Sequence, residues 1–315
     1  MATIPKSVQN DITTIQDDTE SGASQIVKRA VEAFLRLTAD MADAEEELFV
    51  DALDEVAEKL AFAQPAMAPL FNLVNTILNE EDRKQVAGPI QRRVAEACKN
   101  FASGIESSDE AVRRKASGII RDGDTVFTHS NSSTVLKALL HAASRKKKFE
   151  VICTESRPQK EGVALAQALG EAGIPVRFIV DAASGLFVQH ANIILVGADT
   201  VCEKGLVNKI GTYALALTAA ARNVDFYGLC DSSKFLPSGT ELPGQAERPA
   251  HEILSSCPPG VSAVNVYFDT TPLKYCTGII TENGIIKPEA ILQQLHTLKP
   301  HPKLQKLIGK RHNRT

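Results

Sequence analysis

Apolar side chains recur at intervals of three and four residues in three stretches of the first third of the chain, at 20–38, 48–60 and 86–101. This spacing puts them on one face of a helix, and no strand-like run separates the three stretches. The pattern predicts a helical domain over residues 1–120. Its apolar stripes are interpreted as core; alternatively, the loops of this domain also cover a ligand site in the other half.

From residue 121 onward the pattern changes to short apolar runs rich in β-branched and aromatic residues. These runs lie at 125–128, 149–153, 176–180, 193–196, 226–229 and 265–268, and helix-like stretches at 134–143, 164–172 and 212–221 fill most of the gaps. Strands that alternate with helices predict right-handed crossovers and a parallel, doubly wound sheet. We therefore expect an α/β chain whose second domain covers residues 121–315. The segment 235–264, rich in proline, glycine and serine, is expected to be a long surface loop beside the site or an oligomer contact.

Polar residues follow five consecutive predicted strands. They are residues 129–133, 154–158, 181, 197–199 and 231–234. In an open α/β sheet, ligands bind beyond the carboxyl ends of the strands. Any one of these polar groups would ordinarily be a helix cap or a turn residue, but five together predict a small-molecule site at this edge of the sheet.

The residue types at these strand ends suit a phosphorylated ligand. The His-Ser-Asn-Ser-Ser run at 129–133 leads into a predicted helix, where small hydroxyl residues present free N–H groups to an anion. Ser132 or Ser133, taken singly, is more simply an N-cap. Arg157 can hold a phosphate with two parallel hydrogen bonds, and Lys209 and Lys234 would add positive charge.

Two further side chains describe the rest of the ligand. Asn208 could bond a sugar hydroxyl. Asp199 is the candidate acid–base group, because a carboxylate beside an apolar strand can have its pKa raised towards neutrality. Together these residues predict a pocket for a phosphorylated polyol or sugar. The sequence contains neither a Walker loop nor a GxGxxG motif after a strand, so no nucleotide cofactor is expected.

Composition excludes several other classes of protein. Thirty-five basic and thirty-eight acidic residues give a net charge of −3, which argues against a general affinity for nucleic acid. The six cysteines form no CxxC pair and have no histidine at ligand spacing, so we expect no metal and a reduced, cytoplasmic chain. Neither a signal peptide nor a membrane-spanning stretch is expected. The basic segment 299–315 is interpreted as a solvated tail or, less simply, as an RNA or ribosome contact.

Seven short blocks occur in an order that resembles a known family. They are TESRP at 154–158, VDAA at 180–183, GAD at 197–199, NKIGT at 208–212, KF at 234–235, FDTTP at 268–272 and ITENGII at 280–286. The series is similar to the alpha, beta and delta subunits of translation initiation factor 2B and to their metabolic relatives. Those relatives are methylthioribose-1-phosphate isomerase and the archaeal ribose-1,5-bisphosphate isomerase. The match is dense over residues 121–298 and weak before them.

The resemblance implies a helical N-terminal domain joined to a Rossmann-like domain, assembled as a homodimer or a higher homo-oligomer. It also implies a cofactor-free aldose–ketose isomerase acting on a small sugar phosphate. Asp199 and Ser130 would then be the catalytic residues, with Ser130 at the position of a cysteine in the isomerases. The substrate-binding residues would be Arg157, Asn208, Lys209, Lys234 and Gly22.

Three positions depart from the isomerase pattern. Ser130 replaces a cysteine, and a serine hydroxyl is far harder to deprotonate than a thiol, whose reference pKa is about 8.5. Ser21 and Gln64 stand where the isomerases carry arginines that would help to hold phosphate.

Two functions follow from the resemblance and its departures. The first is an aldose–ketose isomerase, which the intact half-site around Asp199 favours and whose catalysis Ser130 would impair. The second is a non-catalytic regulatory subunit that resembles initiation factor 2B alpha of the guanine-nucleotide exchange complex, senses a sugar phosphate and has translation factor subunits as partners. A structural protein with a relict pocket is a third alternative.

Overall fold

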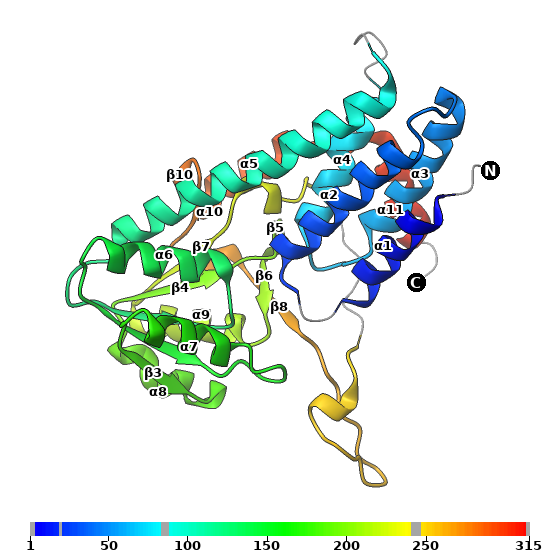
Figure 1. The fold of residues 1–315 in the computed structure, drawn as a ribbon. Helices are drawn as coiled ribbons and strands as arrows, with labels where there is room; N and C mark the ends of the chain where they lie inside the picture. The colour runs from blue at the N-terminus through cyan, green and yellow to red at the C-terminus, as the bar shows by residue number, and fades with distance from the viewer. Residues whose placement is uncertain (1–3, 19–20, 83–87, 241–246, 313–315) are drawn as a thin grey trace. The chain divides into compact units, whose positions relative to one another are not determined.

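The computed structural model describes residues 4–18, 21–82, 88–240 and 247–312 (Figure 1). The chain divides into two compact units. The first unit consists of Met1–Ser107, Ser233–Gly244 and Leu295–Thr315, and the second of Ser108–Ser232 and Gln245–Gln294. Segments that are far apart in the sequence therefore belong to the same unit.

The first unit is built from helices, as its apolar periodicity predicts. Its described residues contain no strand, and they hold α1 (Lys6–Asp17), α2 (Ala23–Asp40), α3 (Glu46–Ala61), α4 (Ala68–Glu81), the first part of α5 (Ile90–Ile119), the end of α10 (Pro288–Thr297) and α11 (Pro302–His312). The core is formed by side chains at helical spacing, among them the fully buried Phe34, Phe49 and Phe71.

The prediction of a solvated tail at the end of the chain is wrong for α11. Leu304 on this helix is fully buried. Lys303 binds the carboxylates of Asp54 and Glu81, at 2.7 and 2.8 Å. Lys303 of this basic segment therefore stabilises the first unit through ion pairs, a role that a count of charges does not reveal.

The second unit contains a seven-stranded sheet. Its strands are β1 (Thr125–Thr128), β2 (Glu150–Thr154), β3 (Val176–Ile179), β4 (Ile193–Gly197), β7 (Asp225–Leu229), β9 (Gly278–Thr281) and β10 (Gly284–Ile286), in the spatial order β10-β9-β7-β4-β1-β2-β3. All neighbours are parallel except β9 and β10, which are antiparallel. The α/β class and the five predicted strands before residue 230 are confirmed.

Helices cover both faces of this sheet. One face, with side chains such as Val126, is covered by the end of α5, α6 (Ser133–Ser144) and α7 (Gly162–Glu171). The other face, with side chains such as Phe127, is covered by α8 (Ser184–Phe187) and α9 (Thr212–Arg222). Successive residues of a strand point to opposite faces. Both faces are therefore apolar, which is why these strands appear in the sequence as continuous apolar runs.

A second, antiparallel sheet lies in the same unit. It has the order β5 (Thr200–Cys202), β6 (Gly205–Lys209) and β8 (Phe268–Thr271). The prediction that the run at 265–268 joins the parallel sheet is wrong, because β8 begins at Phe268 and pairs with β6 in the register Asn208↔Asp269. An apolar run favours a strand but does not specify its partner. Short 3₁₀ helices complete the connections at Asp181–Ala183, Val188–His190, Ser232–Lys234, Ala250–Glu252 and Leu273–Tyr275.

Candidate functional site

The strand order places a topological switch between β1 and β4. From β1 the chain proceeds outward to β2 and β3, and it then returns to β4 on the other side of β1. In open α/β sheets, ligands bind at the carboxyl ends of strands at such a reversal. Ser130 follows β1 and Asp199 follows β4. The two candidate catalytic residues thus follow the two strands that flank the switch.

The end of β4 packs tightly against the loop after β1. A Cβ atom added to Gly197 would lie 2.6 Å from the Oγ atom of Ser132. This is too close for any side chain, so glycine is required here unless Ser132 moves. The Ser132 hydroxyl in turn accepts from the backbone N–H of Val135 at the start of α6, at 3.4 Å. Ser132 is therefore an N-cap, as its residue type favours.

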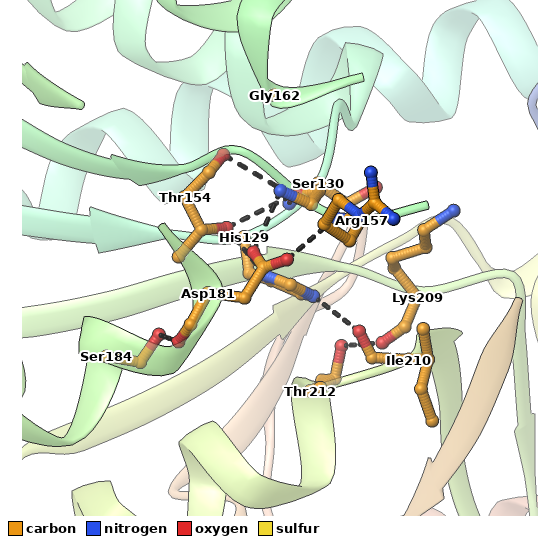
Figure 2. A network of polar contacts seen from close by, with 12 residues as sticks. His129, Ser130, Thr154, Arg157, Gly162, Asp181, Ser184, Lys209, Ile210 and Thr212 are labelled. Atoms are coloured by element: carbon orange, nitrogen blue, oxygen red, sulfur yellow. Dashed lines mark hydrogen bonds and ion pairs between the residues drawn. The ribbon is translucent and has the colours of Figure 1, made fainter. Parts of the chain in front are cut away.

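A chain of hydrogen bonds fixes the loop that carries Ser130 (Figure 2). The backbone N–H of Ser130 donates to Ser156 Oγ at 2.8 Å, and Ser156 Oγ lies 3.0 Å from Thr154 Oγ1. Thr154 Oγ1 lies 2.6 Å from His129 Nδ1, while His129 Nε2 lies 2.8 Å from the Ile210 carbonyl oxygen. Because a carbonyl only accepts, Nε2 carries the proton and Nδ1 accepts from Thr154.

His129 is therefore a neutral structural anchor for the end of β1. Burial lowers the pKa of His129, and this effect outweighs the opposing influence of the Ile210 carbonyl and the nearby carboxylates. A Cβ atom on Gly211 would lie 3.1 Å from the imidazole Nε2 atom, so the ring is also held sterically.

Asp181 holds the turn after β2. Its two carboxylate oxygens accept from the backbone N–H groups of Ser156 and Arg157, at 2.8 and 2.7 Å. Ser156 and Ser130 both have positive φ angles, of 64° and 70°, which non-glycine residues rarely adopt. The hydrogen bonds around both serines support these two backbone conformations at the carboxyl ends of neighbouring strands.

Ser130 and Lys209 meet at a third side chain, Glu161. Glu161 Oε1 accepts from Ser130 Oγ at 3.2 Å and from Lys209 Nζ at 2.8 Å. Lys209 is buried, and its ammonium lies 4.6 Å from the centroid of the Tyr267 ring. Figure 2 shows the Lys209 side chain extending from β6 towards the side on which Ser130 lies. The predicted positive charge of Lys209 is thus paired inside the protein.

Arg157 also makes contacts of its own. Its guanidinium donates to the backbone carbonyls of Glu252 and Ile253, at 3.4 and 3.3 Å. The Glu252 carboxylate accepts from the Tyr267 hydroxyl at 2.6 Å. Burial, followed by this hydrogen bond to Glu252, raises the pKa of Tyr267 to about 12. Glu252 and Ile253, within the predicted long loop at 235–264, therefore contact Arg157 inside the second unit.

Asn208 on β6 contacts the start of α9. The buried Asn208 amide donates to Thr212 Oγ1 at 3.0 Å. Asp269 accepts from the backbone N–H groups of Gly211 and Tyr213, at 2.8 and 3.1 Å, and so caps α9 from β8. Burial raises the pKa of Asp269, against the lowering effect of these two N–H groups.

The predicted site residues fall into two groups. Ser130, Arg157, Asp199, Asn208 and Lys209 all belong to the second unit, at or beyond carboxyl ends of its strands or on β6. The half-buried Asp199 donates its backbone N–H to Val207, the residue before Asn208 on β6.

Lys234 and Gly22 belong to the first unit. The amide of Asn72 donates to the backbone carbonyls on either side of Lys234, those of Ser233 and Phe235, at 2.6 and 2.8 Å. Gly22 is the residue before α2. The substrate-binding roles of these two residues stay predictions.

Glu161 was not among the residues singled out by the sequence, and neither was the Thr154 hydroxyl relay. Glu161 lies in a turn beside Gly162, outside any apolar period, and only its three-dimensional partners distinguish it from a solvated surface acid. A weak signal was available, since an acid three residues after Pro158 follows the second strand end.

The described residues also bear on metal binding, membrane insertion and thiol chemistry. Within that part of the chain, no group of three or more His, Cys, Asp or Glu side chains is arranged to hold a metal ion. No helix there is both long and apolar enough to cross a membrane. The Sγ atom of Cys153 lies 3.6 Å from the carbonyl oxygen of Gly162, close to the turn after β2. Burial, together with the charge of Asp181, raises the pKa of this thiol to about 12. This thiol therefore stays protonated near neutral pH.

Comparison with known proteins identifies the family. The model of the initiation factor 2 subunit family matches residues 19–288, and the chain belongs to this family. A Pyrococcus horikoshii protein named as translation initiation factor eIF-2B subunit 2-like is 38% identical over 295 residues, which cover 92% of this chain and 100% of the relative.

Two isomerases are also similar to the chain. Ribose 1,5-bisphosphate isomerase of Methanocaldococcus jannaschii is 34% identical over 276 residues, covering 85% of this chain and 87% of the relative. The crystal structure of 5-methylthioribose 1-phosphate isomerase from Pyrococcus horikoshii OT3 matches with a TM-score of 0.74 at 25% identity, covering 93% of this chain and 88% of the other. The resemblance seen in the sequence motifs is thereby confirmed.

Proposed function

We propose that this protein is an aldose–ketose isomerase that acts on a small sugar phosphate. The observation that carries the proposal is the placement of Ser130 and Asp199 after the two strands that flank the topological switch. Similarity over most of the chain to a ribose 1,5-bisphosphate isomerase supports it. In this proposal Asp199 is the acid–base group, and Arg157, Asn208 and Lys209 border the substrate.

Two cationic side chains of the candidate site already have partners within the protein. The ammonium of Lys209 is paired with Glu161, and the Arg157 guanidinium is held by two backbone carbonyls. These groups suit a ligand that combines hydroxyl groups with phosphate, because hydroxyl groups both donate and accept while phosphate only accepts near neutral pH.

A regulatory subunit is the second candidate function. Its supporting observation is the full-length similarity, at 38% identity, to a protein named as eIF-2B subunit 2-like. In this alternative the same site binds a sugar phosphate without turnover, and the chain assembles with translation factor subunits or with further copies of itself. Ser130, in place of an ionisable thiol, is compatible with such a role.

Ligand binding and turnover separate the two functions. We expect ribose 1,5-bisphosphate or 5-methylthioribose 1-phosphate to raise the melting temperature, since a ligand at a hundredfold its Kd stabilises the folded state by about 2.7 kcal/mol. An isomerase converts the bound aldose to a ketose, which phosphorus and proton NMR detect directly. Binding without conversion would favour the regulatory subunit, and absence of binding by any pentose or hexose phosphate would contradict both.

Asp199→Asn provides the matched test of the acid–base role. The amide is nearly isosteric with the carboxylate but neither accepts nor donates a proton at neutral pH, so we expect kcat to fall by about 10²–10⁴-fold. Binding of the sugar phosphate should be largely kept, as measured by calorimetry. An unchanged kcat would remove Asp199 from the proposed chemistry.

A further inference from the structure

The Glu161 carboxylate is built into the site more firmly than an ordinary surface acid. Its Oε1 atom accepts from both Ser130 Oγ and Lys209 Nζ. Its Oε2 atom is buried and, among the described residues, has no hydrogen-bond partner. The side chain as a whole retains 25% of its exposure. Oε1 is thus anchored, and Oε2 is a hydrogen-bond acceptor that no donor of the described residues reaches.

The turn that carries Glu161 packs closely against the end of β2. A Cβ atom on Gly162 would lie 1.9 Å from the carbonyl oxygen of Thr154, so the turn lies directly against the end of β2. The backbone N–H of Gly162 donates to the carbonyl of Glu155 at 3.2 Å, and that of Lys160 to the carbonyl of Ser156 at 2.9 Å. The position of Glu161 is therefore set by the same strand end that holds Ser130.

We propose that Glu161 is the second acid–base group of this site and that Ser130 and Lys209 position it. This inference rests on the isomerase function proposed above. The Ser130 hydroxyl is too weakly acidic to act as a base in its anionic form, and the nearby Cys153 thiol stays protonated. A carboxylate, by contrast, is a common general base in enzymes. Lys209 compensates its charge, and Ser130 fixes its orientation.

The proposed step balances without any external reagent. The Glu161 carboxylate removes the proton from C2 of the sugar 1-phosphate, and the C2–H electron pair forms a C1=C2 double bond. The bond between C1 and the ring oxygen breaks, and that oxygen takes the proton of Asp199 in its acid form. Glu161 then returns its proton to C1 while the C2 hydroxyl gives its proton to Asp199, which leaves a ketone at C2. C1 is reduced and C2 is oxidised within one molecule.

The test compares Glu161→Gln and Glu161→Asp with the wild type, using 5-methylthioribose 1-phosphate and ribose 1,5-bisphosphate as probes. The glutamine keeps an oxygen that accepts from Ser130 and Lys209, so the fold is expected to be kept. We expect kcat to fall by about 10²–10⁴-fold with little change in the Kd of the probe. Glu161→Asp should restore part of kcat, because it keeps a carboxylate at this position. Glu171→Gln, at the exposed end of the same helix α7, is the control and should match the wild type.

Isotope exchange and a second variant complete the test. In deuterium oxide, transfer through a base should place solvent deuterium at C1 of the ketose, whereas a direct shift of hydrogen from C2 to C1 would place none and would overturn the proposal. Ser130→Ala leaves the carboxylate present but less well oriented, and its kcat should fall less than that of Glu161→Gln.

The outcomes separate this inference from the proposed function. If the wild type turns over a probe and Glu161→Gln keeps its kcat, the isomerase stands and the role of Glu161 is wrong. If Glu161→Gln loses affinity while the bound form reacts normally, Glu161 serves only to balance Lys209, and the inference is again overturned. If the wild type turns over neither probe, the proposed function itself fails, and Glu161 has no catalytic role.

Discussion

At the scale of the residue, close backbone approaches at strand ends decide which side chains the site accepts. Gly162, Gly197 and Gly211 each lie where a Cβ atom would meet Thr154, Ser132 or His129 at 3.1 Å or less. His129 and Ser132 lie in the loop after β1 that carries Ser130, and Thr154 is the last residue of β2. Packing constraints and functional geometry therefore fall on the same few positions.

Two glycines on one helix provide a matched pair for testing this packing. Gly162→Ala, at the start of α7, should lower the free energy of unfolding by about 1–3 kcal/mol or more, because the new methyl group collides with the Thr154 carbonyl. Gly170→Ala, near the other end of α7, meets no atom within 4 Å and should raise stability by about 0.5–1 kcal/mol, since alanine favours the helix. Urea denaturation measures both. Equal effects of the two substitutions would contradict the close approach at Gly162.

At the scale of the element, the start of α9 is held by a carboxylate from β8. Burial raises the pKa of Asp269 above its ordinary value of 3.8. At a pH between 3.8 and the raised pKa of the folded protein, Asp269 holds a proton in the folded state that it does not hold in the unfolded chain. Stability contributed by this group therefore increases as the pH falls through the window, and it levels off below 3.8.

Asp269→Asn isolates this pH effect. The asparagine oxygen can still accept from the N–H groups of Gly211 and Tyr213, but it does not titrate. We expect the free energy of unfolding of the wild type, minus that of Asp269→Asn, to rise as the pH falls towards 3.8. Other titrating groups are common to both proteins and cancel in the difference. A difference that falls over the same pH range would show that the pKa of Asp269 is lowered in the folded protein.

Elements were predictable from the sequence where a single pattern determines them. The run at 125–128 coincides with β1, and the helix-like stretch at 212–221 differs from α9 by one residue. The short hairpin of β5 and β6 escaped prediction because its strands have three and five residues and no clear alternation. Pairing partners were also hidden: β8 joins β6 across 58 intervening residues, and β10 is antiparallel.

The candidate site shows the same limit. The strand ends marked Ser130, Arg157 and Asp199 as candidates, because a parallel sheet brings its carboxyl ends to one edge. Only a weak local signal, an acid shortly after the second strand end, marks Glu161, because its contacts come from Lys209 on β6 and from the Ser130 hydroxyl in the loop after β1. Contacts between segments that are distant in the chain are not contained in any local pattern.

At the scale of the whole molecule, the end of the chain belongs to the unit in which the chain begins. Residues from Leu295 onward, including α11, are part of the first unit. His301 is buried, donates its backbone N–H to Asn75 Oδ1 at 2.6 Å, and has its Nε2 atom 2.7 Å from Asp82. Although burial acts in the opposite direction, hydrogen bonds to Asp54 and Glu81 raise the pKa of Lys303.

Removal of residues 299–315 should therefore destabilise the helical unit, although most of that unit is formed by the N-terminal part of the chain. It takes away the fully buried Leu304, and loss of one buried leucine side chain costs about 2–5 kcal/mol. We expect a lower melting temperature and faster amide hydrogen exchange in α3 and α4, whose acids Asp54 and Glu81 lose their ion pair with Lys303.

Two point variants serve as controls for the deletion. Leu304→Ala in the full chain should reproduce part of the effect, and Lys306→Ala, on the exposed side of α11, should change stability by less than about 0.5 kcal/mol. Unchanged melting and exchange after the deletion would mean that α11 contributes nothing to the first unit and that the basic segment behaves as a solvated tail.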